Sequence, residues 1–339
     1  MKNNHRKVSI CIVTHSSYEY GIGHLSRSRI ILEQFQELGI DSHIHEFTSA
    51  EIFTTCPLET AEFHGFTIVD FDPRFWSKEN RFIKNFFFAK NSNNNKVLVF
   101  DTPDFWIRDN LAISYAKAIY INPYLDCSST NDNNAFTGLR FFPFSAKLRI
   151  IRKEQIDYSL NDIIVIACGG SDPYGVSKLY LRLLNELNSE PLQIYMSIGP
   201  LFSDNYIKEI QSQATLSQHH VKLFRHEDFE SQVFLKAELV LTSGGLTRYE
   251  LAYCGVPFFT LNFDSRQEAT SNFFYENGAS FHLGHVDDDF SSLSMQFHTK
   301  MNELHQNALK ISQFSRFGRR LFDEVKLSAA QELLELGLL

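Results

Sequence analysis

Short apolar runs rich in β-branched residues alternate along this chain with longer stretches of helical pattern. Runs of this kind, bounded by turn residues, are typical of buried strands. Buried strands that alternate with helices favour parallel sheets covered on both faces, so we predict an α/β protein with two doubly wound sheets. The first series has strands at 8–13, 44–47, 67–71, 97–100 and 118–121, with helices at 25–38, 79–90 and 108–117; the second has strands at 163–167, 193–197, 221–224, 239–242 and 258–261, with helices at 174–188, 203–214, 228–236, 246–254 and 266–277.

A charged segment, KLRIIRKEQIDYSLND at 147–162, lies between the two series. The chain of 339 residues is also too long for one ordinary hydrophobic core and suits two domains. We predict one Rossmann-like domain over residues 1–150 and a second over residues 151–339. The tail from about 290 to 336 is largely helical in pattern, and its last helix is expected to pack back on the first domain.

Composition and charge narrow the class of protein. Hydrophobic residues make up 43% of the chain, and the net charge of −8 argues against general nucleic-acid binding. The five cysteines are widely spaced and form no CxxC pair, which indicates reduced thiols and no zinc site. No apolar run approaches the length of a membrane span, and the basic start does not continue as a signal peptide. We therefore expect a soluble, cytoplasmic protein.

The stretch RFIKNFFFAK at 81–90 mixes aromatic with basic residues. This pattern is mostly that of an amphipathic helix packed on a core, with basic side chains reaching the solvent. A peripheral contact with a membrane surface is the alternative.

Ligands of open parallel sheets bind beyond the C-terminal ends of the strands, so the residues that follow each predicted strand are the candidates for chemistry. After the first strand, Gly21 and Gly23 allow a tight turn and lead into His24. The start of a helix disfavours the imidazolium, and a neutral imidazole is a suitable general base. His24 is either that base or a polar residue beside a structural turn, and Arg27 could bind an anion or be solvated.

The first strand of the second series is followed by CGGSDP at 168–173. Gly169 and Gly170 suit a turn, Ser171 or the next aspartate can cap a helix, and the proline suits its first turn. The N–H groups of such a helix start could bind phosphate, or the segment could be only a well-capped helix.

The fourth strand of the second series is followed by SGGLTRYE, which is the stronger signal. Gly244 and Gly245 bring the backbone near a ligand, Ser243 and Thr247 offer hydroxyls, and the helix start favours a phosphate. Glu250 lies one helical turn beyond Thr247, so it can accept hydrogen bonds from ribose hydroxyls. The alternative is a glycine-rich turn followed by a solvated glutamate.

Two further strand ends carry polar residues. Asp264 and Gln267 follow the last predicted strand and could hold sugar hydroxyls or a phosphate, or could cap the next helix. Asp101 follows the strand at 97–100 and could assist His24 or hold substrate, although a strand-end aspartate that begins a turn is the commoner case. Two histidine pairs, at 43 and 45 and at 219–220, lack acidic or thiol partners at metal-ligand spacing, so no metal site is predicted.

Taken in order, the motifs resemble those of a known group. GxGHxxR after the first strand, GGSDP, and SGGxTxxE followed by GVP and DxRQ look like the pseudaminic-acid-pathway UDP-sugar hydrolases and related spore-coat polysaccharide proteins. They are similar, more distantly, to the glycosyltransferase that adds N-acetylglucosamine to make lipid II. The resemblance covers about residues 8–285 and implies the GT-B architecture, two Rossmann-like domains facing a cleft. The hydrolases usually carry a tyrosine two positions after the aspartate that follows their fourth strand, where this chain has Pro103.

The resemblance also implies which residues hold a UDP-sugar. The backbone near Phe224 would read the uracil, the SGG turn and Thr247 would hold the diphosphate, and Glu250 would hold the ribose. The residues expected to bind nucleotide or substrate are Gly21, Gly23, Arg27, Gly169, Gly170, Ser171, Phe224, Ser243, Gly244, Gly245, Thr247, Glu250, Asp264 and Gln267.

His24 matches the catalytic histidine of that group, with Asp101 as its expected assistant. His24 would activate water or an acceptor hydroxyl for inverting attack on the anomeric carbon, and helix dipoles rather than a metal would stabilise the departing UDP, so no cofactor is expected. We predict a UDP-sugar hydrolase of the pseudaminic-acid type, which releases UDP and free sugar. The alternative is an inverting glycosyltransferase with a sugar or lipid-linked acceptor, and the third reading is a nucleotide-sugar-binding protein without turnover.

Overall fold

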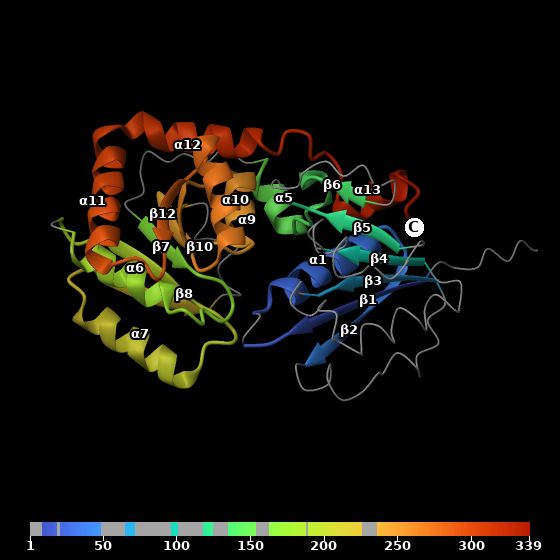
Figure 1. The fold of residues 1–339 in the computed structure, drawn as a ribbon, viewed down its shortest axis with the longest axis horizontal. Helices are drawn as coiled ribbons and strands as arrows, with labels where there is room; N and C mark the ends of the chain where they lie inside the picture. Colours follow the sequence, from blue (N-terminus) through green and yellow to red (C-terminus); the bar gives the residue numbers. More distant parts are fainter. Residues whose placement is uncertain are drawn as a thin grey trace, which may run out of the picture. The chain divides into compact units, whose positions relative to one another are not determined.

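The computed structural model describes residues 9–18, 21–48, 65–71, 96–100, 118–124, 135–153, 163–187, 189–225 and 236–339. The chain divides into two compact units, each of which has its own sheet (Figure 1). Unit 1 combines Met1–Phe144 with Val325–Leu339, and unit 2 is the continuous segment Ser145–Glu324.

Unit 1 is built on a parallel sheet in the strand order β2-β1-β3-β4-β5-β6. Consecutive residues of β4, from Val97 to Phe100, are buried. Because neighbours in a strand point to opposite faces, this run shows that both faces of the sheet are covered. The elements of unit 1 are β1 (Ser9–Ser16), α1 (Gly23–Glu37), β2 (Asp41–Thr48), β3 (Gly65–Asp70), β4 (Lys96–Phe100), β5 (Ala118–Asn122), β6 (Ala135–Thr137), the short 3-10 helix η3 (Leu139–Phe141) and α13 (Ala329–Glu335).

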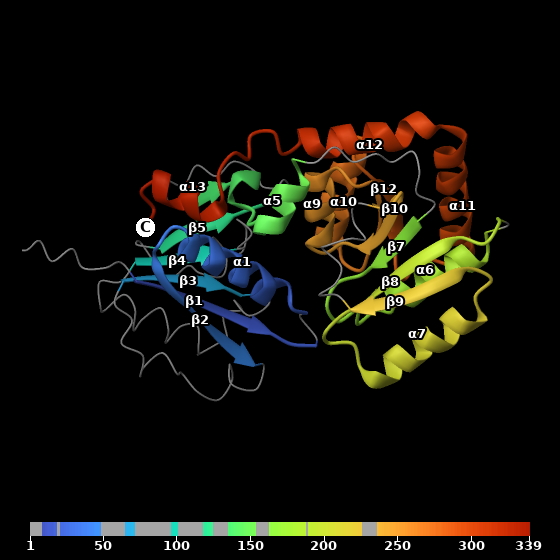
Figure 2. The ribbon, with the colours of Figure 1, turned by 180° about the vertical axis from the view of Figure 1, so that it is seen from behind.

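The last helix, α13, belongs to the core of unit 1. Ala330 and Leu333 are fully buried and join Ile31 and Phe35 of α1 and Phe141 of η3 in one hydrophobic cluster. Both views show α13 beside α1 (Figure 1, Figure 2). Residues from the two ends of the sequence therefore complete the same core.

One buried amide fixes this arrangement. Gln34 of α1 is 1% exposed; its Nε2 donates to the carbonyl of Phe144 at 2.9 Å, and its Oε1 accepts from the N–H of Ala330 at 3.2 Å. The start of α13 is also capped within itself, since Ser328 and Gln331 form a reciprocal capping box. Both polar ends of the Gln34 side chain are thus satisfied inside the unit.

Unit 2 is built on a second parallel sheet, in the strand order β12-β11-β10-β7-β8-β9. Consecutive residues of β11 point to opposite faces: Phe258 packs against Phe274 of α10, with ring centroids 5.6 Å apart, and Phe259 packs against Phe297 of α11 at 6.0 Å. The elements of unit 2 are α5 (Ala146–Ile151), β7 (Ile163–Ala167), α6 (Val176–Asn185), β8 (Gln193–Ile198), α7 (Asp204–Leu216), β9 (His220–Arg225), β10 (Leu239–Ser243), α9 (Thr247–Cys254), β11 (Phe258–Asn262), α10 (Ser265–Glu276), β12 (Phe281–His285), α11 (Phe290–Gln306) and α12 (Ala308–Arg320).

Helix α6 is held on the sheet of unit 2 by an apolar stripe and by a buried hydrogen bond. It buries Val176, Tyr180, Leu183 and Leu184, a spacing that places them on one helical stripe against the sheet. The buried hydroxyl of Tyr180 donates to the carbonyl of Thr242 at 3.0 Å, so the helix is fixed to the end of β10 by a hydrogen bond as well as by apolar contact.

The predicted α/β class with two parallel sheets is confirmed, and every predicted strand lies on an observed one. The prediction missed β6, which has only three residues, and β12, where Gly284 (φ 122°) and two histidines obscure the apolar pattern. The helices predicted at 79–90 and 108–117, and most of that at 228–236, lie outside the described residues. In the part of the chain that the structure describes, no helix combines the length and the apolar character needed to cross a bilayer.

Candidate active site

Each sheet has one point at which its strand order reverses, and such points are where open parallel sheets bind ligands. In unit 1 the chain goes from β1 outward to β2 and then returns to β3 on the other side of β1. In unit 2 it goes from β7 outward to β8 and β9 and then returns to β10. The turns that follow β1, β3, β7 and β10 are therefore the candidate ligand sites.

The turn after β1 positions His24. Gly21 has φ 76°, a left-handed conformation that favours glycine, and its N–H and carbonyl bond to the backbone of Ser17 at 2.7 and 3.2 Å. Helix α1 then begins at Gly23, which makes His24 its second residue. The side chain of His24 is 11% exposed, so the ring is largely enclosed and still reaches the surface.

The partner of His24 is Asp70, the last residue of β3. His24 Nδ1 lies 2.8 Å from Asp70 Oδ1, and the carboxyl is fully buried. An ionised carboxylate can only accept, so this hydrogen bond requires a proton on Nδ1. The neutral ring then carries its basic lone pair on Nε2.

Arg27 and Ser28 hold the Asp70 carboxylate in place. Arg27 Nε donates to Oδ2 at 3.0 Å, a terminal guanidinium nitrogen donates to Oδ1, and the hydroxyl of Ser28 donates to Oδ2 at 3.0 Å. Arg27, 2% exposed, also donates to the hydroxyl of Tyr124. Burial alone would raise the pKa of Asp70, but the charge of Arg27 and the hydrogen bonds from His24 and Arg27 hold the pKa well below its usual range.

A second contact competes for His24 Nδ1. A terminal nitrogen of Arg27 lies 2.9 Å from it, and a guanidinium can only donate, so a hydrogen bond there would need Nδ1 to accept. Because Asp70 is ionised, the bond from Nδ1–H to the carboxylate is the stronger one, and Arg27 is then a close neighbour. On its other side the ring of His24 stacks on that of His15, with centroids 5.2 Å apart.

In unit 2, the turn after β10 contains two glycines in different surroundings: Gly244 is packed against neighbouring side chains, and Gly245 is open. A Cβ atom at Gly244 would lie 2.5 Å from Gln267 Oε1 and 2.6 Å from Asn262 Oδ1, so only glycine fits there. A Cβ atom at Gly245 would meet only Ser243 Oγ, at 3.9 Å. Helix α9 begins two residues later, so the turn leads directly into a helix N-terminus that can bind an anion.

A buried polar network supports this turn from behind. Arg248, 5% exposed, donates to the carbonyl of Gln267 at 2.7 Å and to the hydroxyl of Ser271 at 2.9 Å. Ser271 donates to Asn262 Oδ1 at 2.8 Å, and the amide of Asn262 lies 2.8 Å from His282 Nε2. Burial lowers the pKa of His282, which keeps this ring neutral in the network.

The segment CGGSDP after β7 differs from its prediction. Helix α6 begins at Val176, after Gly175 (φ 68°), so the proline at 173 is not in its first turn and the glycines are not at its N-terminus. Asp172 caps α6 by accepting from Val176 N–H at 2.8 Å and Ser177 N–H at 2.9 Å, and its own φ of 43° redirects the chain. The well-capped helix is therefore present, with the aspartate as its cap, and Gly169 and Gly170 belong to a separate loop that packs against Gly199, so phosphate binding by these glycines stays a prediction.

The remaining predicted residues fall into three situations. Asp264 caps α10, accepting from Gln267 N–H at 2.8 Å, and Gln267 Oε1 accepts from Phe263 N–H at 3.1 Å, so the capping alternative is present. Phe224 lies on the edge strand β9, with β8 and β7 between it and β10. Asp101 lies outside the described residues. The substrate contacts predicted for these residues stay predictions.

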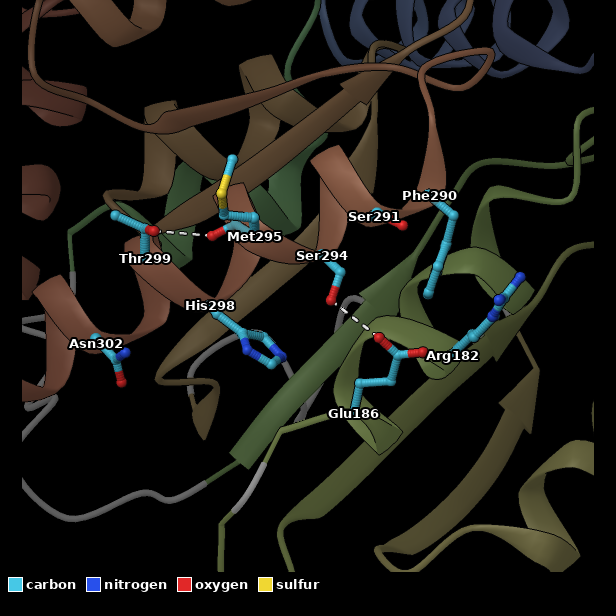
Figure 3. Close-up of a pocket in the computed structure, with 9 residues that line it drawn as sticks. All are labelled: Arg182, Glu186, Phe290, Ser291, Ser294, Met295, His298, Thr299 and Asn302. Atoms are coloured by element: carbon cyan, nitrogen blue, oxygen red, sulfur yellow. Dashed lines mark hydrogen bonds between the residues drawn. The ribbon is translucent and has the colours of Figure 1, made fainter.

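A pocket of about 530 Å³ lies between α6 and α11 (Figure 3). The guanidinium of Arg182 is 3.5 Å from the ring centroid of Phe290, and Ser294 donates to Glu186 at 2.9 Å, so its wall residues hold the two helices together. Arg182 and Glu186 are near the C-terminal end of α6, away from the strand ends that start it. Over the described ranges, no three histidine, cysteine, aspartate or glutamate side chains gather as a metal site.

Sequence reasoning missed the residues that complete both sites. Asp70 lies inside the strand predicted at 67–71, and only the strand order shows that β3 lies next to β1. Tyr124 follows β5, and Asn262 is the last residue of β11, so both are polar residues at strand ends, where ligand sites are expected. The sequence therefore shows polar residues at these strand ends, but it does not show which strands are neighbours in the sheet.

No family model matches this sequence. The uncharacterized protein MJ1062 of Methanocaldococcus jannaschii is 22% identical over 316 residues, which cover 84% of this chain and 61% of that protein. This chain thus spans about three fifths of the length of that relative.

Solved structures resemble both units together. MurG of Acinetobacter baumannii has a TM-score of 0.61 and 13% identity, over 97% of this chain and 99% of that one. Anabaena Alr3699/HepE in complex with UDP-glucose has a TM-score of 0.58 and 14% identity, over 97% of this chain and 100% of that one. A glycosyltransferase from Rickettsia africae has a TM-score of 0.61 and 10% identity, over 98% of this chain and 98% of that one. At such identities the likeness concerns the fold alone. The chain has the GT-B fold, with one parallel α/β sheet in each of its two units, as its motifs predicted.

Proposed function

We propose that this chain is an inverting glycosyltransferase that takes its sugar from a UDP-sugar donor. The observation that carries the proposal is the 2.8 Å hydrogen bond between His24 Nδ1 and the carboxylate of Asp70, at the point where the first sheet reverses its strand order. This pairing gives a ring whose basic nitrogen is Nε2, the form that a general base needs. Two of the solved structures support the class: one holds UDP-glucose and the other is a glycosyltransferase.

Unit 2 would hold the donor. The N–H groups of Gly244 and Gly245 and the start of α9 suit a diphosphate, because the free N–H groups and dipole of a helix N-terminus attract negative charge. Glu250, in the first turn of α9, would accept hydrogen bonds from the ribose hydroxyls. Phe224 on β9 would lie toward the uracil.

His24 would take the proton of an acceptor hydroxyl through Nε2. The acceptor oxygen then bonds to the anomeric carbon, and the bond from that carbon to the diphosphate oxygen breaks, with its electron pair leaving on UDP. Attack opposite to the departing group inverts the anomeric centre. Asp70 stabilises the imidazolium that forms, as a buried carboxylate does beside a histidine base.

Water in place of the acceptor hydroxyl gives the hydrolase that the motifs suggested. The observation that favours this second candidate is the occurrence of GGSDP together with the His24 turn in one sequence. The solved structures support the transferase better, since they include a glycosyltransferase. The two candidates share donor, base and stereochemistry, and they differ only in the nucleophile.

The test is incubation of the purified chain with a panel of UDP-sugars, with and without sugar and lipid-linked acceptors, followed by chromatography of UDP, free sugar and product. Release of UDP that depends on an acceptor, with a new inverted glycoside, supports the transferase. Release of free sugar without acceptor supports the hydrolase. Binding of UDP-sugar without any release would contradict both.

Replacing His24 should remove the chemical step and leave donor binding in place. A general base contributes on the order of 100- to 10,000-fold to the rate, so His24→Asn should nearly abolish turnover. UDP affinity, measured by calorimetry, should stay near that of the wild type, because the nucleotide is assigned to unit 2. His43→Asn, at an exposed histidine of β2 in the same unit, serves as the matched control and should keep full activity.

Turnover should not depend on a divalent cation. The groups assigned to the diphosphate are backbone N–H groups, hydroxyls and a helix N-terminus, which can stabilise the departing charge without a metal. Initial rates measured after EDTA treatment and after gel filtration should match those of untreated protein. A rate that falls on chelation and returns with magnesium or manganese would overturn this assignment.

A further inference from the structure

Two aromatic rings stack on each other at the C-terminal edge of the sheet in unit 2. Tyr174, in the loop between β7 and α6, and Phe263, between β11 and α10, have ring centroids 4.5 Å apart and planes inclined by 20°. Tyr174 is 55% exposed, so one side of the pair is open to solvent. Phe263 is held from behind, since its backbone N–H donates to Gln267.

The strand order places this pair over the glycine turn. β10 lies between β7 and β11 in the sheet, so a side chain that follows β7 can reach one that follows β11 only by passing beyond the end of β10. The two outer strands are separated by roughly 9–10 Å, twice the usual spacing between strands. The rings therefore bridge the end of β10, where Gly244 and Gly245 carry no side chain.

The glycine turns after β7 and β10 are open. Among the described residues, a Cβ atom at Gly169 would meet nothing within 4 Å, and one at Gly245 would meet only Ser243 Oγ at 3.9 Å. Both glycines follow the strands, β7 and β10, between which the strand order reverses. An exposed aromatic face thus lies beside the backbone to which the diphosphate is assigned.

The order of strands also indicates which part of a donor would meet the rings. If the uracil lies toward Phe224 on β9, the nucleoside extends from the diphosphate across β7 and β8. The aromatic pair reaches from β7 past the end of β10 to β11, and its Phe263, next to Asp264 in the sequence, lies on the side of β10 away from β8 and β9. The group on that side of the diphosphate is the sugar.

Resting on the proposed function, we propose that Tyr174 and Phe263 form an aromatic platform for the sugar moiety of the nucleotide-sugar donor. One face of a pyranose ring exposes C–H groups, and burying that apolar face against an aromatic ring is favourable. The pair contributes to donor affinity and selects sugars that present such a face. It makes no contact with the nucleoside.

Calorimetry with UDP and with UDP-glucose or UDP-N-acetylglucosamine separates these contributions. Tyr174→Ala should weaken binding of the UDP-sugar about tenfold, as for loss of one aromatic contact, while UDP binding changes less than twofold. Phe263→Leu should weaken the UDP-sugar in the same selective way, and Tyr174→Phe should keep wild-type affinity. Tyr275→Ala, at a 45% exposed tyrosine of α10, is the matched control and should change neither ligand.

If Tyr174→Ala weakens the binding of UDP and of UDP-sugar equally, or weakens neither, the aromatic platform is overturned. The proposed function is not affected by that result, because donor binding by the wild-type chain would still support the donor site. Failure of the wild-type chain to bind UDP or any UDP-sugar would overturn the proposed function and the platform with it. Circular dichroism of each variant shows whether a loss of binding comes from misfolding. Where Tyr174→Ala perturbs the loop, Tyr174→Phe still tests the platform, because it retains the aromatic ring.

Discussion

Asp70 is a fully buried carboxylate that accepts hydrogen bonds from three side chains. Burial of a charge is costly unless it is paired, and here His24, Arg27 and Ser28 supply hydrogen bonds to its two oxygens. Arg27 is itself 2% exposed, so the two charges depend on each other. Asp70 therefore fixes the ring of His24 and also balances the positive charge of the buried Arg27 guanidinium.

Replacing Asp70 should affect stability and rate together. Asp70→Asn leaves Arg27 buried without its counter-charge, which should cost about 3–5 kcal/mol in the free energy of unfolding. The amide also fails to fix the Nδ1–H tautomer of His24, so kcat should fall while KM for the donor stays near wild type. Asp41→Asn, at the exposed start of β2, is the matched control.

The stability difference should shrink in acid. The pKa of Asp70 is held below its ordinary value near 3.8, so the stability it contributes is present above about pH 4 and is lost as the pH falls below that. Asp70→Asn lacks this titration. Urea unfolding of both proteins between pH 7 and pH 3 should show the two curves converging at low pH, and curves that stay parallel would show that Asp70 is not ionised in the fold.

At the scale of elements, the two glycines after β10 have different constraints. Gly244→Ala would place a Cβ atom against the side chains of Gln267 and Asn262 and should cost about 1–3 kcal/mol, as overpacking does. Gly245→Ala meets only Ser243 Oγ, at 3.9 Å, and should leave the melting temperature unchanged. Thermal unfolding of this matched pair checks the packing of the turn, and equal melting temperatures would contradict it.

Strand positions could be predicted because buried parallel strands are short apolar runs, and the turns after them were identified from glycine and hydroxyl residues. His24, the proposed base, was identified in this way as well. Its partner Asp70 was not, because Asp70 lies inside the strand predicted at 67–71, and only the observed pairing of β3 with β1 brings it beside His24. The start of α6 was misplaced because Pro173 is typical of a first helical turn, whereas Asp172 and Gly175 adopt positive φ and delay the helix.

At the scale of the whole molecule, α13 comes last in this sequence but packs in the core of unit 1, against helix α1. Leu333 is fully buried among residues of α1 and η3, so Leu333→Ala should lower the stability of unit 1 by about 2–5 kcal/mol. Leu334, 39% exposed on the same helix, gives the control variant Leu334→Ala, with little expected effect. Hydrogen exchange of the full chain should show faster opening in unit 1 and unchanged protection in unit 2.

The return of the chain to unit 1 has a consequence for biosynthesis. Unit 2 is one continuous segment, and all of it has been translated before α13 leaves the ribosome. Residues 1–144 of unit 1 are made before unit 2, yet Ile31 and Phe35 have no α13 to cover them until that helix has been synthesised. The unit that begins earlier along the chain is thus the later one to complete its core, and in the interval its exposed apolar surface is a part of the nascent protein that a chaperone would recognise.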